Sequence, residues 1–148
     1  MLTVDDYLPF HAIARQLVHA CPGFVSAGEV ASGREACRAI EASEPGLVLM
    51  DVHMPDVDGI AVARWIRRRH HNVVVVLIST DEPAALPSAA FNCGAAAVLR
   101  KQDHPRLAAE LGVYMGDRGV GQDLPRRILG SIEKQCCGRR HYGADKGS

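Results

Sequence analysis

The chain has 148 residues, of which 47% are hydrophobic and 23% charged, a composition typical of a globular protein and unlike that of disordered or fibrous chains. This length allows one domain with a full core and is too short for two domains of ordinary size. Lys plus Arg and Asp plus Glu both number 17, so no chain-wide charge would attract nucleic acid or an anionic membrane.

The N-terminus and the apolar runs predict a cytoplasmic protein with no membrane attachment. Residues 1–10 include Asp5 and Asp6 and lack the apolar region of a secretory signal. The longest apolar run, Val73 to Ile78, is far shorter than the roughly 18 residues that a membrane span needs. An odd number of cysteines without zinc-binding spacing indicates reduced thiols, namely Cys21, Cys37, Cys93, Cys136 and Cys137.

In the first half of the chain, short apolar runs alternate with amphipathic stretches, as in repeated β-α units around a parallel sheet. In order, we expect a strand at Leu2 to Val4, a helix from about Leu8 to before Pro22, a strand at Phe24 to Val30, a helix capped by Ser32 and closed by Pro45-Gly46, and a buried strand at Leu47 to Met50 that leads into Asp51. The residues expected to face the core are Ala12, Ile13, Leu17 and Val18 in the first helix and Ala36, Ala39 and Ile40 in the second.

In the second half, a third helix is expected to turn Ile60, Ala63 and Ile66 inward and to end in the basic run 67–71. We interpret that run as complementing the helix dipole rather than as a nucleic-acid patch. The apolar run Val73 to Ile78 predicts a strand covered on both faces and central in the sheet. The remaining expected elements are a helix over about 83–92 that Pro87 shortens or bends, a strand at Ala95 to Leu99, and a helix over about 105–115.

The segment after residue 116 differs in composition, being rich in Gly and Arg. We therefore expect one domain over residues 1–116 and a C-terminal linker or tail over 117–148 with one helix at about 123–134. A helix-turn-helix domain needs three or more helices, so we predict no complete output domain and no specific DNA binding by this chain.

Acidic residues are expected to gather at one edge of the sheet. Asp5 and Asp6 follow the first strand and Asp51 ends the third, and doubly wound folds bind ligands where the carboxyl ends of their strands meet. Three carboxylates without a counter-charge would repel one another, so the arrangement indicates a bound cation. Magnesium suits the set because it takes one or two carboxylates and shares phosphate oxygens.

Two further side chains follow strands at the same edge, the hydroxyl of Ser79 and the ammonium of Lys101. Phosphoryl transfer to a carboxylate requires a nucleophile, charge neutralisation on the phosphoryl oxygens and a hydrogen-bond donor. Asp51 would attack, magnesium and Lys101 would neutralise, and Ser79 would donate. Each residue alone has an ordinary structural explanation, such as a cap or a solvated side chain, but the set together favours a phosphoryl-transfer site.

Four segments resemble the signature blocks of two-component response-regulator receiver domains, closest in style to NarL/LuxR-type regulators. They are residues 4–6, 49–59, 77–79 and 94–101, and the resemblance covers about residues 2–115. It implies an α/β fold, the flavodoxin-like (CheY-like) (βα)5 doubly wound sandwich with parallel sheet order 2-1-3-4-5. It also implies a regulatory phosphoacceptor domain rather than an enzyme.

The resemblance assigns roles to individual residues of the site. It implies a histidine kinase or a phosphotransfer protein as donor and Asp51 as phosphoacceptor. Asp5, Asp6 and Asp51 would bind Mg2+, or Mn2+ in its place, together with the backbone carbonyl of His53. Ser79 takes the position of the switch hydroxyl and Lys101 that of the family lysine. Pro55 and Gly59 match the loop that shapes the pocket.

Several positions depart from the family pattern. Val98 stands where the family usually has a Tyr or Phe that rotates inward on phosphorylation. Thr80 stands where Ala or Gly is commoner and is expected to narrow access to the phosphoryl site. His53 and Asp81 would flank the pocket mouth, where family positions tune the lifetime of the phosphoaspartate, although both also fit ordinary exposed loop positions.

The sequence leaves the output of the domain open between two readings. The chain is a stand-alone receiver acting through protein contacts or phosphorelay, or a NarL/LuxR-type regulator without its DNA-binding half. We expect a homodimer or partner interface on the face formed by the fourth helix, fifth strand and fifth helix.

A rival from another class is an aspartate-nucleophile phosphohydrolase of the haloacid-dehalogenase type. Residues 56–60 formally fit the D-x-D nucleophile loop of such enzymes, with Asp56 as nucleophile. That loop directly follows a buried strand, whereas here the expected strand ends at Asp51 and Met54-Pro55 intervenes. We therefore favour the receiver.

Overall fold

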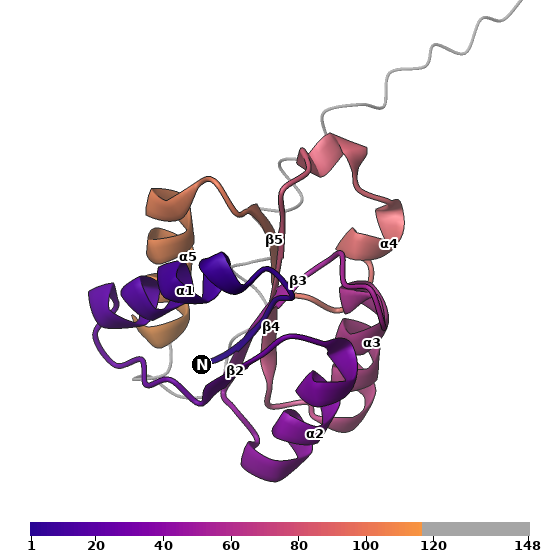
Figure 1. Ribbon diagram of the computed structural model, residues 1–148, viewed down its shortest axis with the longest axis horizontal. Coiled ribbons are helices and arrows are strands. Elements are labelled where there is room, and N and C mark those ends of the chain that lie inside the picture. Colours follow the sequence, from indigo (N-terminus) through magenta and orange to yellow (C-terminus); the bar gives the residue numbers. More distant parts are fainter. Residues whose placement is uncertain (117–148) are drawn as a thin grey trace, which may run out of the picture.

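A computed structural model describes residues 1–116 and shows, in this part of the chain, helices packed on both faces of a parallel sheet (Figure 1). Its strands are β1 (Leu2–Val4), β2 (Gly28–Val30), β3 (Leu47–Asp51), β4 (Val74–Ser79) and β5 (Ala97–Arg100). They pair in parallel in the order β2-β1-β3-β4-β5. The predicted (βα)5 fold and its sheet order are therefore confirmed.

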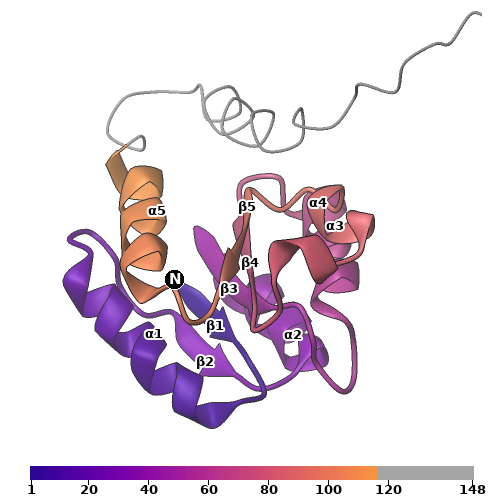
Figure 2. The same cartoon turned by 90° about the horizontal axis from the view of Figure 1, so that it is seen from above.

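The helices of residues 1–116 form the two outer layers, as the view from above shows (Figure 2). They are α1 (Leu8–Ala20), α2 (Gly33–Ser43), α3 (Gly59–Arg69), α4 (Ser88–Phe91) and α5 (His104–Gly116), with a short 3-10 helix, η1 (Pro83–Ala85), before α4. In Figure 2, α1 and α5 lie on one face of the sheet and α2, α3 and α4 on the other. The connections between parallel strands thus place helices on both faces.

The sheet separates two hydrophobic cores because successive residues of a strand point to opposite faces. In β3, Val48 and Met50 belong to the core under α2 and α3, whereas Leu47 and Leu49 belong to the core under α1 and α5. All four side chains are buried, and such burial contributes roughly 1.5–3 kcal/mol for each large apolar side chain. The packing on both faces fixes where β3 ends and hence where Asp51 lies.

Three strand predictions need correction. The strand expected over Phe24 to Val30 has only the residues Gly28–Val30, because its partner β1 pairs Leu2 with Gly28 and offers no strand opposite the preceding residues. The run Val73 to Ile78, predicted to be the central strand, corresponds to β4 (Val74–Ser79). The central strand is β3, because β4 lies between β3 and β5. The fifth strand begins at Ala97, two residues later than expected.

The predicted helix ranges are close to the observed ones, but the predicted buried face of α1 is not. In α1 the buried residues are Phe10, His11, Ala14 and Leu17, whereas Ala12 is exposed, so the buried face is rotated from the expected one. The helix expected over 83–92 is broken, as predicted, into η1 and α4 on either side of Pro87. Proline lacks the N–H that a continuous helix would need there. The other helices lie close to their expected ranges.

Some predictions fall outside the described residues: the helix at about 123–134, the tail from residue 117, and the thiols Cys136 and Cys137. Within residues 1–116 the cysteines, Cys21, Cys37 and Cys93, are free thiols as predicted. No helix in that range is long and apolar enough to cross a membrane.

Candidate functional site

The residues singled out in the sequence lie at the carboxyl edge of the sheet, where backbone hydrogen bonds extend the pairing one step beyond the strands. The N–H of Asp5 donates to Val30 O at 3.0 Å, and the N–H of Lys101 donates to Ser79 O at 2.8 Å. The N–H of Val52, next to Asp51, donates to Ile78 O at 2.9 Å. The sheet itself therefore sets the starting points of the site side chains.

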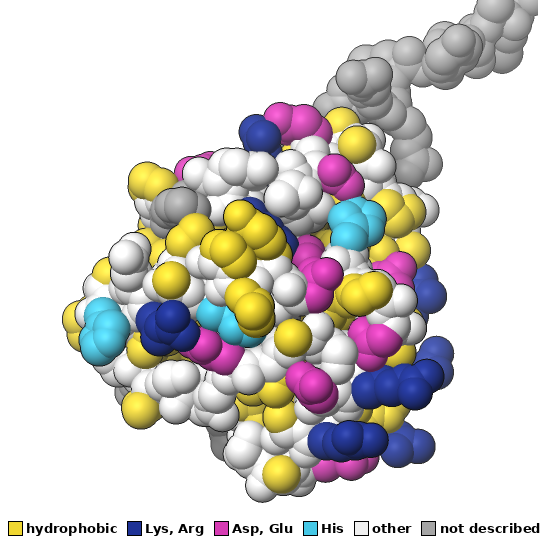
Figure 3. All heavy atoms as spheres, viewed as in Figure 1, with side chains coloured by type: hydrophobic (Ala, Val, Ile, Leu, Met, Phe, Trp, Pro, Cys, Tyr) yellow, Lys and Arg dark blue, Asp and Glu magenta, His cyan; other side chains and the backbone are white. Residues whose placement is uncertain are grey.

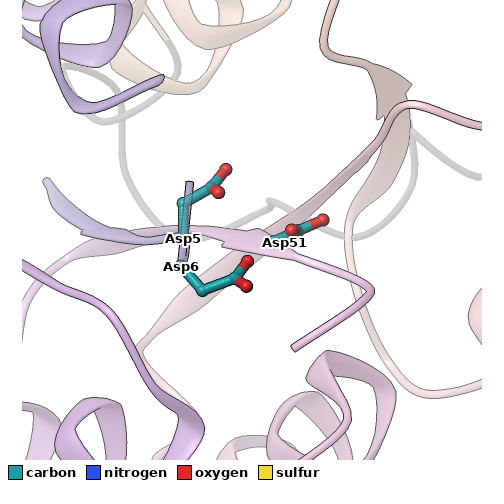
Figure 4. A group of neighbouring side chains, drawn as sticks. All are labelled: Asp5, Asp6 and Asp51. Carbon is teal, nitrogen blue, oxygen red and sulfur yellow. The ribbon is translucent and has the colours of Figure 1, made fainter. Parts of the chain in front are cut away.

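Three carboxylates meet at this edge. One oxygen from each of Asp5, Asp6 and Asp51 lies within 4.8 Å of the others. Figure 4 shows Asp5 and Asp6 on the chain that leaves β1, with Asp51 beside them at the end of β3. Asp5 and Asp51 are buried, at 0% and 5% exposed, whereas Asp6 is exposed. The cluster thus has two buried members and one that is open to solvent.

Lys101 bridges the two buried carboxylates. Its Nζ lies 2.8 Å from Asp51 Oδ2 and 2.7 Å from Asp5 Oδ2, and Lys101 itself is buried. Nζ also lies 5.3 Å from the centre of the Phe10 ring, a cation-π distance. Phe10 was not anticipated as a neighbour of the site, and the turn of α1 toward the sheet brings it there. A buried ammonium in this position neutralises part of the acidic charge.

Burial and charge shift the pKa values of this pair. Burial raises the pKa of Asp51, and the hydrogen bond and charge of Lys101 oppose this rise without cancelling it. The nearby Asp5 charge raises the pKa of Asp51 further. For Lys101, burial alone would lower the pKa, but the neighbouring carboxylates of Asp5 and Asp51 outweigh it and hold the pKa above its usual value.

The cluster fits a divalent cation. With all three carboxylates ionised and Lys101 protonated, its charge is three negative against one positive, which leaves two negative charges to balance. Asp5 Oδ2 is buried and, despite its short distance to Lys101 Nζ, is not aligned for a hydrogen bond, so it retains the capacity to bind a cation. Oxygen donors of this kind suit Mg2+.

Ser79 lies at the end of β4 and is only 1% exposed. Its Oγ accepts a hydrogen bond from the N–H of Asp81 at 3.1 Å, which leaves the hydroxyl proton available to a ligand. The next residue, Thr80, is exposed, and its carbonyl accepts a hydrogen bond from Gln102 Nε2 at 3.4 Å. The sheet edge thus presents a hydroxyl donor on the strand between Asp51 and Lys101.

A side-chain contact joins two loops at this edge of the sheet. His53 Nε2 lies 2.8 Å from Asp81 Oδ2, and both side chains are exposed. The pair joins the loop after β3 to the loop after β4. In the space-filling view, histidine and acidic side chains lie at the surface near the point where β1 ends (Figure 3). The sequence placed both residues at the pocket mouth but did not predict that they pair.

Val98 contributes to core packing. Val98 lies in β5, is partly buried, and packs against the core under α2 and α3. Its side chain has neither a ring nor a polar group, so it cannot repeat the rotation of an aromatic residue that carries a hydroxyl.

Gly59 is required by close packing against the phosphoacceptor candidate. A Cβ atom on Gly59 would lie 2.0 Å from the main-chain oxygen of Asp51, so any side chain would force β3 and α3 apart. The N–H of Gly59 donates to Val52 O, and Asp58 caps α3 by accepting from the N–H of Ile60 at 2.7 Å. These hydrogen bonds hold both ends of the loop between β3 and α3.

Asp56 has a structural task that the sequence did not reveal. Its two carboxylate oxygens accept from the N–H groups of Gly33 and Arg34, at 3.0 and 3.1 Å, and so cap α2 from another loop. These hydrogen bonds lower the pKa of Asp56, the one from Gly33 most strongly. Asp56 therefore lies in the loop between β3 and α3 and contacts the N-terminus of α2. The phosphohydrolase hypothesis instead requires Asp56 to follow a buried strand directly.

Residues 1–111 match the sequence model of the response regulator receiver domain. This protein belongs to the response regulator receiver domain family. Its fold and sheet order are those that the family resemblance implied, and the acidic edge lies within the matched residues.

Individual relatives agree with this membership. Response regulator UvrY of Escherichia coli O157:H7 is 29% identical over 138 residues, which are 91% of this chain and 63% of UvrY. The receiver chain thus spans less than two thirds of that relative.

Solved receiver structures show the same fold. A LuxR-family regulator from Aurantimonas sp. SI85-9A1 superposes with a TM-score of 0.71 at 25% identity, over 92% of this chain and 96% of that one. The signal receiver domain of the response regulator NarL from Mycobacterium tuberculosis gives 0.60 at 26% identity, over 93% and 95%.

Proposed function

We propose that Asp51 accepts a phosphoryl group from a histidine kinase or a phosphotransfer protein in a Mg2+-dependent relay. The observation that carries this proposal is the Lys101 ammonium, which bridges Asp5 and Asp51 inside a set of three carboxylates within 4.8 Å of one another. The domain is a regulatory phosphoacceptor rather than an enzyme that turns over a substrate. Family membership supports the same conclusion.

In this reaction a carboxylate oxygen of Asp51 attacks the phosphorus of a phosphohistidine on the donor. The new bond is O–P, the N–P bond breaks with its electron pair going to the histidine nitrogen, and that nitrogen then takes up a proton from water. Lys101, already 2.8 Å from Asp51 Oδ2, neutralises charge on the phosphoryl oxygens, and the Ser79 hydroxyl donates a hydrogen bond to one of them. After transfer, Lys101 exchanges a carboxylate partner for a phosphoryl partner.

Asp5, Asp6 and Asp51 would hold the metal together with the main-chain carbonyl of His53. When bound, Mg2+ supplies neutralisation of the charge that the phosphoryl oxygens share with the carboxylates. The two uncompensated negative charges of the cluster and the unaligned Asp5 Oδ2 support this assignment. Mn2+ would serve as well, because it also prefers oxygen ligands.

Residues around the rim would set how long the phosphoaspartate lasts and how it signals. Thr80, next to Ser79, and the His53–Asp81 pair are exposed and would limit the approach of water to the phosphoaspartate. Val98 cannot act as a rotating aromatic, so we propose that the signal travels through the β4–α4 segment that follows Ser79, without a side-chain rotation at position 98.

A phosphorylation experiment tests the proposal. The full chain is incubated with acetyl phosphate and Mg2+, and the modified residue is located by mass spectrometry. Asp51→Asn should abolish uptake of the phosphoryl group, and the matched variant Asp56→Asn should retain it. Uptake by Asp51→Asn at the wild-type level would reject Asp51 as acceptor. Steady hydrolysis of a phosphate ester that only Asp56→Asn abolishes would instead establish the phosphohydrolase.

We propose that the phosphorylated domain signals through protein contacts. A second candidate is the receiver portion of a NarL/LuxR-type transcriptional regulator, which is favoured because the match to UvrY covers 91% of this chain but only 63% of UvrY. Sequencing the gene downstream of Ser148 decides between them. For this chain alone, a gel-shift assay at physiological salt should show no sequence-specific DNA binding.

The face made by α4, β5 and α5 is our proposed homodimer or partner surface. Phe91, on α4, is 39% exposed and is among the large apolar side chains that the described part of the chain presents to solvent. Sedimentation velocity with and without beryllofluoride tests this surface. A dimer that forms only with beryllofluoride and is lost in Phe91→Ser would support this dimer surface. Identical sedimentation in all samples would rule it out.

A further inference from the structure

His11 is a buried side chain next to the acidic cluster that the phosphoryl-transfer mechanism does not use. It lies on α1 and is 8% exposed. Its Nε2 lies 2.8 Å from the main-chain oxygen of Asp5. A carbonyl oxygen can only accept, so Nε2 carries a proton and donates. Nδ1 lies 3.5 Å from Glu29 Oε2, which Arg15 holds at 2.6 Å.

The oxygen that His11 contacts belongs to the peptide unit that joins Asp5 to Asp6. A peptide unit is planar, so holding its oxygen restricts the rotation of the whole unit. On the other side of Asp5, its N–H donates to Val30 O at 3.0 Å, and its Oδ1 accepts from the N–H of Tyr7 at 2.9 Å. Asp6 is exposed, so its direction depends on this peptide unit rather than on surrounding side chains.

We infer that His11 is a positioning residue for the cation site: its hydrogen bond to Asp5 O orients the Asp5–Asp6 peptide so that both carboxylates reach the cluster with Asp51. This inference rests on the proposed Mg2+ dependence of the site. On the other side of the ring, Nδ1 lies 3.5 Å from Glu29 on β2, so the imidazole lies between β2 and the end of β1. Without the hydrogen bond the peptide unit can rotate and Asp6 can leave the cluster.

The two ring nitrogens can be separated by substitution. His11→Gln keeps an amide donor at the position of Nε2 and so keeps the contact with Asp5. His11→Asn places its amide at the position of Nδ1, facing Glu29, and His11→Leu removes both. Leu17→Val is the matched control, because Leu17 is a buried residue of the same helix and belongs to the core under α1 and α5.

The experiment measures Mg2+ affinity directly, by titrating metal-free full chain and following amide NMR resonances of Asp5, Asp6 and Asp51. Urea unfolding of the same metal-free samples reports the stability of each variant. We expect His11→Leu and His11→Asn to bind Mg2+ about tenfold more weakly, the factor that one net hydrogen bond contributes. His11→Gln should stay close to wild type. Leu17→Val should lose stability and keep wild-type affinity.

The outcomes separate this inference from the proposal on which it rests. Wild-type affinity in His11→Leu, or equal weakening in His11→Gln and Leu17→Val, would overturn the positioning role while leaving the phosphoacceptor proposal intact. A wild-type chain whose Asp5, Asp6 and Asp51 resonances ignore Mg2+ would remove both.

Discussion

The Nζ atom of Lys101 lies 2.8 Å from Oδ2 of Asp51, although Asp51 ends β3 and Lys101 follows β5, the two strands on opposite sides of β4. Both are buried, so water screens their attraction little. The same ammonium faces Asp5 at 2.7 Å. Lys101 is therefore the counter-charge on which two buried carboxylates depend when no cation is bound.

Removing that counter-charge should destabilise the domain. Lys101→Met leaves Asp5 and Asp51 buried without a cation, and we expect a loss of roughly 3–5 kcal/mol in unfolding free energy in metal-free buffer. Mg2+ should restore part of the loss. Urea denaturation with EDTA and then with Mg2+ measures both effects.

The control for this variant is Arg106→Met. Arg106 pairs with Glu110 at 3.9 Å on an exposed part of α5, and such pairs contribute about 0.3–0.5 kcal/mol. Equal losses in the two variants would contradict the role given to Lys101.

The raised pKa of Asp51 predicts a pH dependence of stability. Its folded pKa lies above the usual aspartate value of 3.8, so its ionisation favours the unfolded chain. The corresponding stability is present below that value and is lost as pH rises through the folded pKa. Asp51→Asn cannot ionise, so in EDTA its advantage over wild type should grow as pH increases from 3 toward neutrality, as measured by urea denaturation. A pH-independent difference would contradict this.

Asp56 should show the opposite sign. The pKa of Asp56 is lowered, first by its hydrogen bond from the N–H of Gly33, so its contribution is present above the unfolded value of 3.8 and is lost as pH falls through the folded pKa. Asp56→Ala should be less stable than wild type at neutral pH and approach it in acid. Guanidinium denaturation across this pH range measures the convergence, and parallel curves would show that the cap does not act through its charge.

Gly59 and Gly112 form a matched pair of alanine substitutions. At Gly59 the new Cβ would lie 2.0 Å from Asp51 O, and relieving such overpacking costs about 1–3 kcal/mol or more. Gly59→Ala should also slow phosphoryl uptake, because the displaced atom belongs to the acceptor residue.

At Gly112, in α5, a Cβ meets nothing within 4 Å. Gly112→Ala should therefore gain up to about 1 kcal/mol from helix propensity and leave uptake unchanged. Thermal unfolding and the acetyl phosphate assay compare the two, and similar behaviour would contradict the close approach at Gly59.

The candidate site could be predicted from the sequence because each of its members sits at a strand end. Asp51 and Lys101 follow short apolar runs, and parallel strands bring such positions to one edge whatever their separation along the chain. The family resemblance then gave the sheet order, which periodicity alone did not. The roles of these residues in phosphoryl transfer stay predictions.

Contacts that depend on how elements rotate or dock could not be predicted. The buried face of α1 includes His11, a polar residue that an apolar pattern leaves out. Asp56 caps a helix that begins 23 positions earlier in the chain, and local capping rules look only at neighbouring residues. The late start of the strand expected from Phe24 depended on its partner, since β1 offers pairing only from Leu2 onward.

Because β3 is hydrogen-bonded on both sides while β2 lies at the edge, the sheet should not open uniformly. Amide protons of β3 then exchange with solvent only when the whole domain unfolds, whereas those of β2 exchange through local fraying. The backbone of β3, which carries Asp51, should consequently open only when the native state unfolds, and local motion near Asp51 should be confined to the loops.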